Sequence, residues 1–250
     1  MKLIRVLNLL TLLLTITVNS LANILPINGL QTGAISDSFP LLFTPAGYVF
    51  AIWGVIYLAL TVFGIYQILP SQRGNQRIDR IGPWFIIANL ANAGWIFAWH
   101  YQLFPLSLAL MLVLLVALLT IYLRLGIGAQ RVSTSEKLLV NLPFSIYLGW
   151  ISVATVANVS VVLYGLNWNG FGIDPVVWTV ALIAVAALLG GLMIFLRREV
   201  AYPLVLVWAL AGIWVKNGQA GTVALAALGA AVLVALLIVV SRLLPRKGTV

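Results

Sequence analysis

The sequence contains no cysteine and a single histidine, His100. Without cysteine, disulfides, thiolate chemistry and cysteine-ligated metal sites are excluded. One histidine cannot build a multi-histidine metal site within one chain, although a lone axial ligand to a haem iron stays open. His100 ends an apolar stretch, so its ordinary interpretation is a hydrogen-bonded helix-end residue. We therefore expect no metal site and no required cofactor.

Acidic residues are also scarce, with five in 250 residues. All five are expected in loops or at helix ends, so the mid-membrane ionisable group typical of proton pumps and ion-coupled carriers is absent. The sequence also lacks the acidic clusters that hold Mg²⁺ in lipid-phosphate and prenyl transferases. Since no acid–base pair lies within an apolar stretch, we expect a binding protein rather than an enzyme and name no catalytic residue. The acidic residues are Asp37, Asp79, Glu136, Asp174 and Glu199.

Hydrophobic residues, by contrast, make up 63% of the chain and charged residues 8%, with a mean hydropathy of +1.12. A soluble domain carries about 25% charged residues, so the surplus apolar surface is expected to face lipid. A helix needs about 20 apolar residues to cross the hydrocarbon core. The sequence predicts an all-α, polytopic membrane helical bundle of about eight transmembrane helices. Their approximate ranges are 4–22, 45–69, 82–100, 105–124, 138–164, 175–196, 201–216 and 221–243.

The positive charges follow a regular pattern along the chain. Of the 14 Lys and Arg residues, all but Lys216 fall in every second gap between the apolar stretches. Because short cytoplasmic loops retain Lys and Arg, this pattern predicts that the N- and C-termini are both cytoplasmic. The net charge of +9 is spread over short loops and forms no stripe, which argues against nucleic acid. We expect the lipid bilayer as partner, with basic residues near anionic headgroups, in a bacterial plasma (inner) membrane.

The first apolar stretch has two interpretations. Lys2 and Arg5 precede the stretch 9–18, and the residues at 20–22 resemble a small-x-small cleavage site, as in a signal peptide. Alternatively it is the first helix of the bundle, with Asn8 and several threonines forming a polar stripe. Both interpretations stay open here.

The residue composition also differs between parts of the chain. The segment 23–44 is polar and long enough to fold over the mouth of a bundle as a lid. The first five apolar stretches contain Trp, Tyr and Asn, whereas the last three are rich in Leu, Val and Ala, with small residues at four-residue spacing. We therefore predict a working bundle over 1–166 and three additional helices of unknown role over 167–250.

Polar and aromatic residues recur at helical spacing in the second, third and fifth apolar stretches. An amide that faces lipid would cost several kcal/mol, so these helix faces are expected to point inward and towards each other. The result would be a cavity lined by aromatic rings and amides, suited to a flat, mostly apolar ligand with a polar edge. The candidate ligand-binding residues are Trp53, Tyr57, Asn92, Trp95, Tyr147, Trp150, Ala154 and Asn158.

An alternative explains the same residues without a pocket. Tryptophan and tyrosine anchor helices at membrane interfaces, and asparagine in a membrane helix often bonds only to a neighbouring helix. The aromatic residues near predicted helix ends, which this alternative assigns to the interface, are Tyr48, Trp84, Trp99, Trp168 and Trp178.

Three local motifs carry a family resemblance. They are the run Phe43–Trp53 continued by Ile56-Tyr57, the segment Asn92-Ala93-Gly94-Trp95, and the run Tyr147–Thr155 followed by Asn158. Together, in this order and on these helices, they resemble the tryptophan-rich sensory protein family, also called the translocator protein or peripheral-type benzodiazepine receptor family. The resemblance covers about residues 1–166, and the three last helices resemble nothing that we can name.

The resemblance implies a five-helix bundle whose first loop covers a pocket for porphyrins and other tetrapyrroles, haem included. Some members of that family bind sterols or isoquinoline-type drugs, and homodimers are common. Sensing, transport and degradation of tetrapyrroles are the roles that the resemblance suggests. By position, the pocket would involve Trp53, Asn92, Trp95, Trp150 and Ala154.

The sequence departs from the family pattern at several positions. Ala46 replaces a motif proline, and Tyr48 replaces a motif tryptophan, which reduces the ring area at the mouth. Val159 stands where the sterol-recognition pattern has an aromatic residue, so that pattern is not met. The alternatives left open are a transporter of another small hydrophobic metabolite, a tetrapyrrole-degrading enzyme, and a structural or signalling partner.

Overall fold

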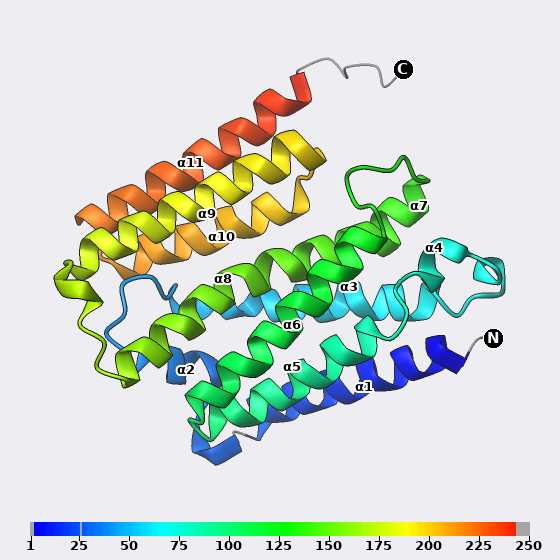
Figure 1. Ribbon diagram of the computed structural model, residues 1–250, viewed down its shortest axis with the longest axis horizontal. Coiled ribbons are helices and arrows are strands. Elements are labelled where there is room, and N and C mark those ends of the chain that lie inside the picture. The colour runs from blue at the N-terminus through cyan, green and yellow to red at the C-terminus, as the bar shows by residue number, and fades with distance from the viewer. Residues whose placement is uncertain (1–2, 26, 244–250) are drawn as a thin grey trace.

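The computed structural model describes residues 3–25 and 27–243, and these residues form helices and loops without a strand (Figure 1). Lys2, Arg246 and Lys247 of the charge pattern lie outside the described residues. The long helices match the predicted stretches closely except over 45–69, where a short 3-10 helix at 47–51 precedes the α-helix, which ends at Tyr66. They are α1 (Leu3–Ile24), α3 (Ile52–Tyr66), α5 (Trp84–His100), α6 (Phe104–Arg124), α8 (Leu142–Gly165), α9 (Pro175–Arg197), α10 (Ala201–Lys216) and α11 (Thr222–Leu243).

Six of the described helical segments are long and apolar enough to cross a membrane. The helices α5 and α10 are shorter, with 17 and 16 residues. The chain is therefore an integral, multi-pass membrane protein, as the composition predicts. The cytoplasmic location of the two termini stays a prediction.

Short helical elements connect the long helices. The predicted lid contains η1 (Ile27–Gly29) and α2 (Thr32–Asp37), and η2 (Gly47–Ala51) leads into α3. The other short elements are η3 (Pro70–Gln72), α4 (Gln76–Asp79), α7 (Thr134–Glu136), the π-helical turn Lys137–Asn141 that precedes α8, and η5 (Gly170–Gly172).

The first five long helices form a closed ring in the order α1, α3, α8, α6, α5. A buried polar stripe on α1 joins this helix to α5. The hydroxyl of Thr15 donates to the carbonyl oxygen of Asn89 at 2.9 Å, and the Asn19 amide donates to Asn92 Oδ1 at 2.8 Å. The polar stripe expected of a bundle helix is thus confirmed, and it explains why α1 packs inward.

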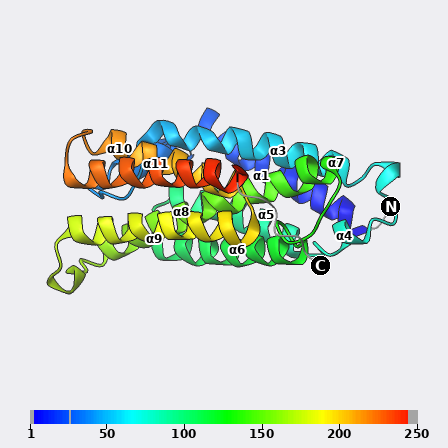
Figure 2. The same cartoon turned by 90° about the horizontal axis from the view of Figure 1, so that it is seen from above.

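The last three helices pack on one another beside this ring, and α10 connects them to it (Figures 1 and 2). Helix α10 lies against α8 and η2. At Gly149 of α8, an added Cβ would lie 3.1 Å from the carbonyl oxygen of Tyr202 and 3.1 Å from Val205 Cβ. The absence of a side chain at Gly149 therefore allows α8 and α10 to approach closely.

At the end of the ring near the N-terminus, a buried arginine closes the bundle. Arg5 is 5% exposed, and its guanidinium forms an ion pair with Asp79 at 2.9 Å. It also donates to the carbonyl oxygens of Gln67 and Gln72, at 2.9 and 2.8 Å. The expectation that the loop arginines contact lipid headgroups is therefore wrong for Arg5, because its donors bond within the protein.

Candidate functional site

Five aromatic residues that the sequence placed in the site meet at the centre of the ring. The Trp53 ring centroid lies 6.3 Å from Trp95, 6.0 Å from Tyr147 and 6.1 Å from Trp150. Tyr57 stacks on Trp53 with a centroid separation of 5.4 Å. The rings come from α3, α5 and α8, so the structure unites residues far apart in the sequence. We call these five residues the aromatic cluster.

A buried amide organises the polar atoms of the aromatic cluster. Asn92 Nδ2 donates to the phenol oxygen of Tyr147 at 2.7 Å, and Asn92 Oδ1 accepts from Asn19 at 2.8 Å. The Tyr57 hydroxyl lies 3.4 Å from the same Oδ1, which is long for a hydrogen bond between these groups. Asn92 therefore links α1, α5 and α8 by hydrogen bonds through one fully buried side chain, which also lies next to α3.

The remaining predicted residues lie on the other side of the aromatic cluster. Asn158 Oδ1 accepts a hydrogen bond from the Trp95 indole at 3.0 Å, and its amide donates to Ser107 of α6 at 2.9 Å. Ala154 lines a small cavity beside Trp150. All eight predicted residues therefore contact this central region.

That cavity has a volume of about 30 Å³. It can hold a water molecule, whereas ligand sites usually measure about 300–1,000 Å³. The expected open cavity is closed because the rings pack on one another, and Phe50 of η2 packs edge-on against Trp150 at 5.5 Å. The lining residues are Ser36, Thr44, Pro45, Phe50, Trp53, Trp95, Trp99, Trp150, Val153, Ala154, Ala157, Asn158 and Val161.

One donor beside the cavity is unusual. Trp150 is 1% exposed, and its indole N–H has no hydrogen-bond partner among the described residues. A buried donor normally has a partner, because an unpaired one costs about 1–3 kcal/mol. This N–H is therefore suited to donate to an acceptor on a bound molecule.

The lid is fastened to the end of α5. The Trp99 indole donates to the carbonyl oxygen of Thr32 at 3.2 Å, and the Thr32 hydroxyl lies 3.0 Å from His100 Nε2. The other ring nitrogen of His100 lies 3.1 Å from the carbonyl oxygen of Ile27. Trp99 is 4% exposed, so the assignment of Trp99 to the membrane interface is wrong. Both ring nitrogens of His100 therefore contact the lid.

Helix α10 also holds the lid, and the sequence did not predict this contact. The Lys216 ammonium hydrogen-bonds to Thr44 and pairs with Asp37 at 3.6 Å. Asn217 donates to the carbonyl oxygen of Leu42 at 2.9 Å, beyond the end of the helix. The Trp208 indole donates to the carbonyl oxygen of Val49 at 3.1 Å. The only signal in the sequence was the isolated position of Lys216 in the charge pattern.

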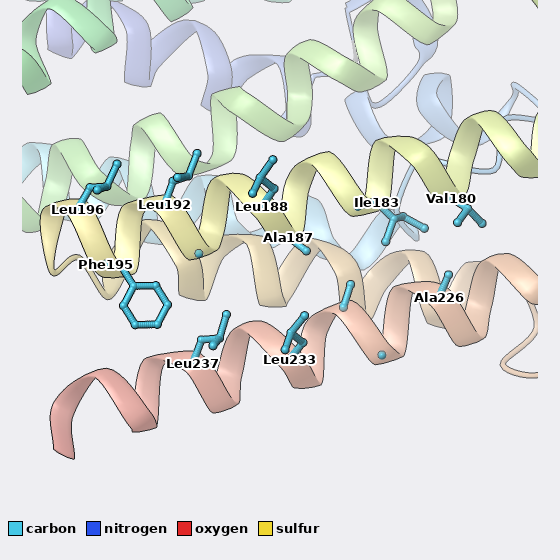
Figure 3. Close-up of a pocket in the computed structure, with 14 residues that line it drawn as sticks. Val180, Ile183, Ala187, Leu188, Leu192, Phe195, Leu196, Ala226, Leu233 and Leu237 are labelled. Atoms are coloured by element: carbon cyan, nitrogen blue, oxygen red, sulfur yellow. The ribbon is translucent and has the colours of Figure 1, made fainter. Parts of the chain in front are cut away.

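A larger hollow lies away from the aromatic cluster, between α9 and α11 (Figure 3). It measures about 670 Å³, and its lining consists of Ala, Gly, Val, Ile, Leu and Phe. Figure 3 shows Leu188 and Leu192 of α9 and Leu233 and Leu237 of α11 along it. None of the predicted site residues reaches this groove, so its apolar surface is that of a lipid-facing helix pair.

The comparisons with known proteins bear on the whole chain. No curated protein and no solved structure matches it significantly. A family model described as TSPO-like protein matches residues 5–240. The match continues beyond residue 166, where the resemblance in motifs ended, and it takes in α9, α10 and most of α11. Since it spans most of the chain, the chain belongs to the TSPO-like protein family.

Proposed function

We propose that this membrane protein binds a flat, mostly hydrophobic ligand of the tetrapyrrole class at the aromatic cluster, for sensing or transport. The observation that carries the proposal is the convergence of Trp95 and Trp150 on Trp53, together with the buried Trp150 indole N–H, which has no partner among the described residues. Flat ligands stack favourably on such rings. Membership in the TSPO-like family is consistent with a ligand-binding role.

Binding requires the closed cavity to open, because about 30 Å³ cannot hold a macrocycle. Phe50 is the element best placed to move, since it lies on the short helix η2 directly after the lid and covers Trp150. A ligand that displaced Phe50 would stack on Trp53 and Trp150. The Trp150 N–H would then donate to the polar edge of the ligand. The Tyr57 hydroxyl, which lies 3.4 Å from Asn92 Oδ1, would be a second donor.

Titration of the detergent-purified protein with protoporphyrin IX, followed in the porphyrin absorption band, tests the proposal. We expect saturable binding that weakens by about tenfold in Trp150→Phe, since one hydrogen bond contributes about 1 kcal/mol and the ring area shrinks. Trp168→Phe is the matched control, because Trp168 lies after α8 and packs on Phe171 and Trp178, outside the ring. Non-saturable signals of equal size in all three proteins would reject the proposal.

Catalysis is not part of this proposal. The five carboxylates, at Asp37, Asp79, Glu136, Asp174 and Glu199, lie outside the eight long helices.

Sensing and transport both need the proposed site. Counterflow of labelled ligand in proteoliposomes distinguishes the two roles, because only a transporter produces it.

We also propose that the two parts of the chain have different roles. Residues 1–166 would carry the ligand site, and 167–250 would hold the lid through α10. A bacterial plasma membrane as location and a homodimer as assembly remain our expectations from the sequence.

A further inference from the structure

A second hollow of ligand size touches the aromatic cluster from outside the ring. It lies between α1 and α3, beneath α2 and η2, and measures about 590 Å³. Trp53 and Phe50 line both this groove and the small central cavity, so their side chains form the boundary between the two. We call it the lateral groove. Unlike the central cavity, it is large enough for a small ligand without any rearrangement.

The helices on either side of the lateral groove carry exposed aliphatic side chains. On α1, Leu21 and Ile24 are 46% and 72% exposed, and on α3, Leu58 is 69% exposed. In a membrane these side chains contact lipid. The lateral groove is therefore reached from the bilayer, near the end of the bundle that the lid covers.

The lining of the lateral groove differs from its surroundings. It includes Asn19, Asn23, Gln31, Tyr57 and Trp53. The amide nitrogens of Asn19 and Asn23 donate within the protein, so their side-chain oxygens and the amide of Gln31 remain to bond to a ligand. An amide that faces hydrocarbon without a partner costs several kcal/mol, so an acyl chain alone does not satisfy this lining. The Tyr57 hydroxyl, 3.4 Å from Asn92, is available for a better hydrogen bond.

Charge narrows the class of ligand further. None of the described residues that line the lateral groove is Lys, Arg, Asp, Glu or His. A carboxylate or phosphate placed there would lose its hydration without gaining a counter-ion. Hydroxyl and carbonyl groups, by contrast, both match amides, which donate and accept.

We propose that the lateral groove binds an uncharged, single-chain amphiphile with a hydroxyl- or carbonyl-bearing head, drawn from the lipid bilayer. The head would bond to the amides below the lid, and the chain would extend along Gly54 of α3 into the surrounding lipid. This site adjoins the proposed tetrapyrrole site and shares Trp53, Phe50 and Tyr57 with it, but it does not depend on that proposal, because the lateral groove is open while the central cavity is closed.

Gly54 offers a direct test, since it lines the lateral groove and an added Cβ meets nothing within 4 Å. Gly54→Leu should fill the groove without disturbing the fold. Gly229→Leu is the matched control, because Gly229 is also helical, also open at its Cβ, and lies in the apolar groove of α11. Both substitutions add the same side chain to a membrane helix.

The probe is monooleoylglycerol brominated on its chain, added to the protein in phosphatidylcholine nanodiscs, with quenching of tryptophan fluorescence as the readout. We expect saturable quenching at low probe content. The half-saturation point should rise by about tenfold or more in Gly54→Leu and stay unchanged in Gly229→Leu. Trp53→Phe should lose most of the saturable component.

Brominated oleate and brominated phosphatidylcholine test the charge argument and should give no saturable component. If quenching depended only on bromine content and were equal for all probes and variants, the probes would be acting as annular lipid around the protein. That result would overturn the proposal. Saturable quenching by brominated oleate equal to that by brominated monooleoylglycerol would overturn the proposal that the ligand is uncharged. Protoporphyrin binding to Gly54→Leu is measured in parallel and should be retained, so failure of either proposal leaves the other testable.

Discussion

The backbone N–H of Ala46 donates to the carbonyl oxygen of Gly212 at 3.2 Å, joining the motif loop to α10. Gly212 makes this approach possible, because a Cβ there would overlap the Val49 side chain and lie 3.0 Å from Pro45 Cβ. Val49 and Pro45 are both buried. The segment that leads into the aromatic cluster is thus packed directly against the C-terminal helices.

Gly212→Ala should therefore destabilise the protein. Overpacking costs about 1–3 kcal/mol, whereas alanine gains about 1 kcal/mol over glycine in a helix, so we expect a net loss. Thermal unfolding in detergent should show a lower apparent Tm. In Gly229→Ala, where a Cβ meets nothing within 4 Å, only the helical gain applies and the apparent Tm should hold or rise. Equal rises in both variants would contradict the tight contact at Gly212.

Lys216→Met should loosen the lid more than Asp37→Asn does. The ion pair is partly exposed, with 22% of the Lys216 side chain and 46% of the Asp37 side chain accessible, so alone it contributes about 0–1 kcal/mol. Lys216 also bonds to Thr44, which is fully buried, and that bond is lost only in Lys216→Met.

Hydrogen exchange measures this difference. Amides in 41–49 should exchange faster in Lys216→Met, slightly faster in Asp37→Asn, and unchanged in Arg73→Met, since Arg73 is an exposed residue beyond the far end of α3. Identical exchange in all three variants would show that α10 holds the lid without Lys216.

The inward-facing residues of the site could be predicted because helical spacing determines which side chains share a face. Asn92, Trp95, Trp150 and Asn158 are all buried, as the cost of a lipid-facing amide requires. The spacing does not determine how much space remains between such faces. The closed cavity depends on the rotamers of several rings from α3, α5 and η2, and no local pattern encodes them.

The role of α10 was equally inaccessible to sequence reasoning. Its contacts with the lid use backbone carbonyls of Leu42 and Val49 and the missing side chain of Gly212, none of which has a sequence signature. The same holds for Trp99, whose position near a helix end suggests an interface anchor until the lid is placed on it. The contacts of α10 and Trp99 therefore depend on the tertiary structure and not on the local sequence.

Asn92 and Tyr147 should be strongly coupled. Asn92→Leu leaves the Tyr147 hydroxyl without its partner, and an unpaired buried group costs about 1–3 kcal/mol. The Asn19 amide loses one of its two acceptors and keeps the carbonyl oxygen of Thr15 at 2.9 Å. In a double-mutant cycle, Asn92→Leu and Tyr147→Phe should give a combined loss smaller than the sum, with a coupling of about 0.5–3 kcal/mol. Asn23→Leu, on the exposed side of α1, should show no coupling with Tyr147→Phe.

Glu199, in the loop between α9 and α10, should make the stability of the protein depend on pH. Burial raises the pKa of Glu199, and the opposing effects of the Ser145 hydroxyl, the Tyr202 backbone and the charges of Lys137 and Arg242 are smaller. The folded protein therefore binds this proton more tightly than the unfolded chain does. The stabilisation is complete below the ordinary glutamate pKa, about 4.3, and is lost as the pH rises through the raised pKa.

Glu199→Gln should remove that dependence, because glutamine imitates the protonated carboxyl at every pH. The apparent Tm of the native protein should fall as the pH rises from about 4.3, while that of Glu199→Gln falls less. The two proteins should therefore agree most closely at low pH, and the variant should be the more stable at high pH. Parallel curves for the native protein and Glu199→Gln would show that Glu199 carries no excess proton affinity in the fold.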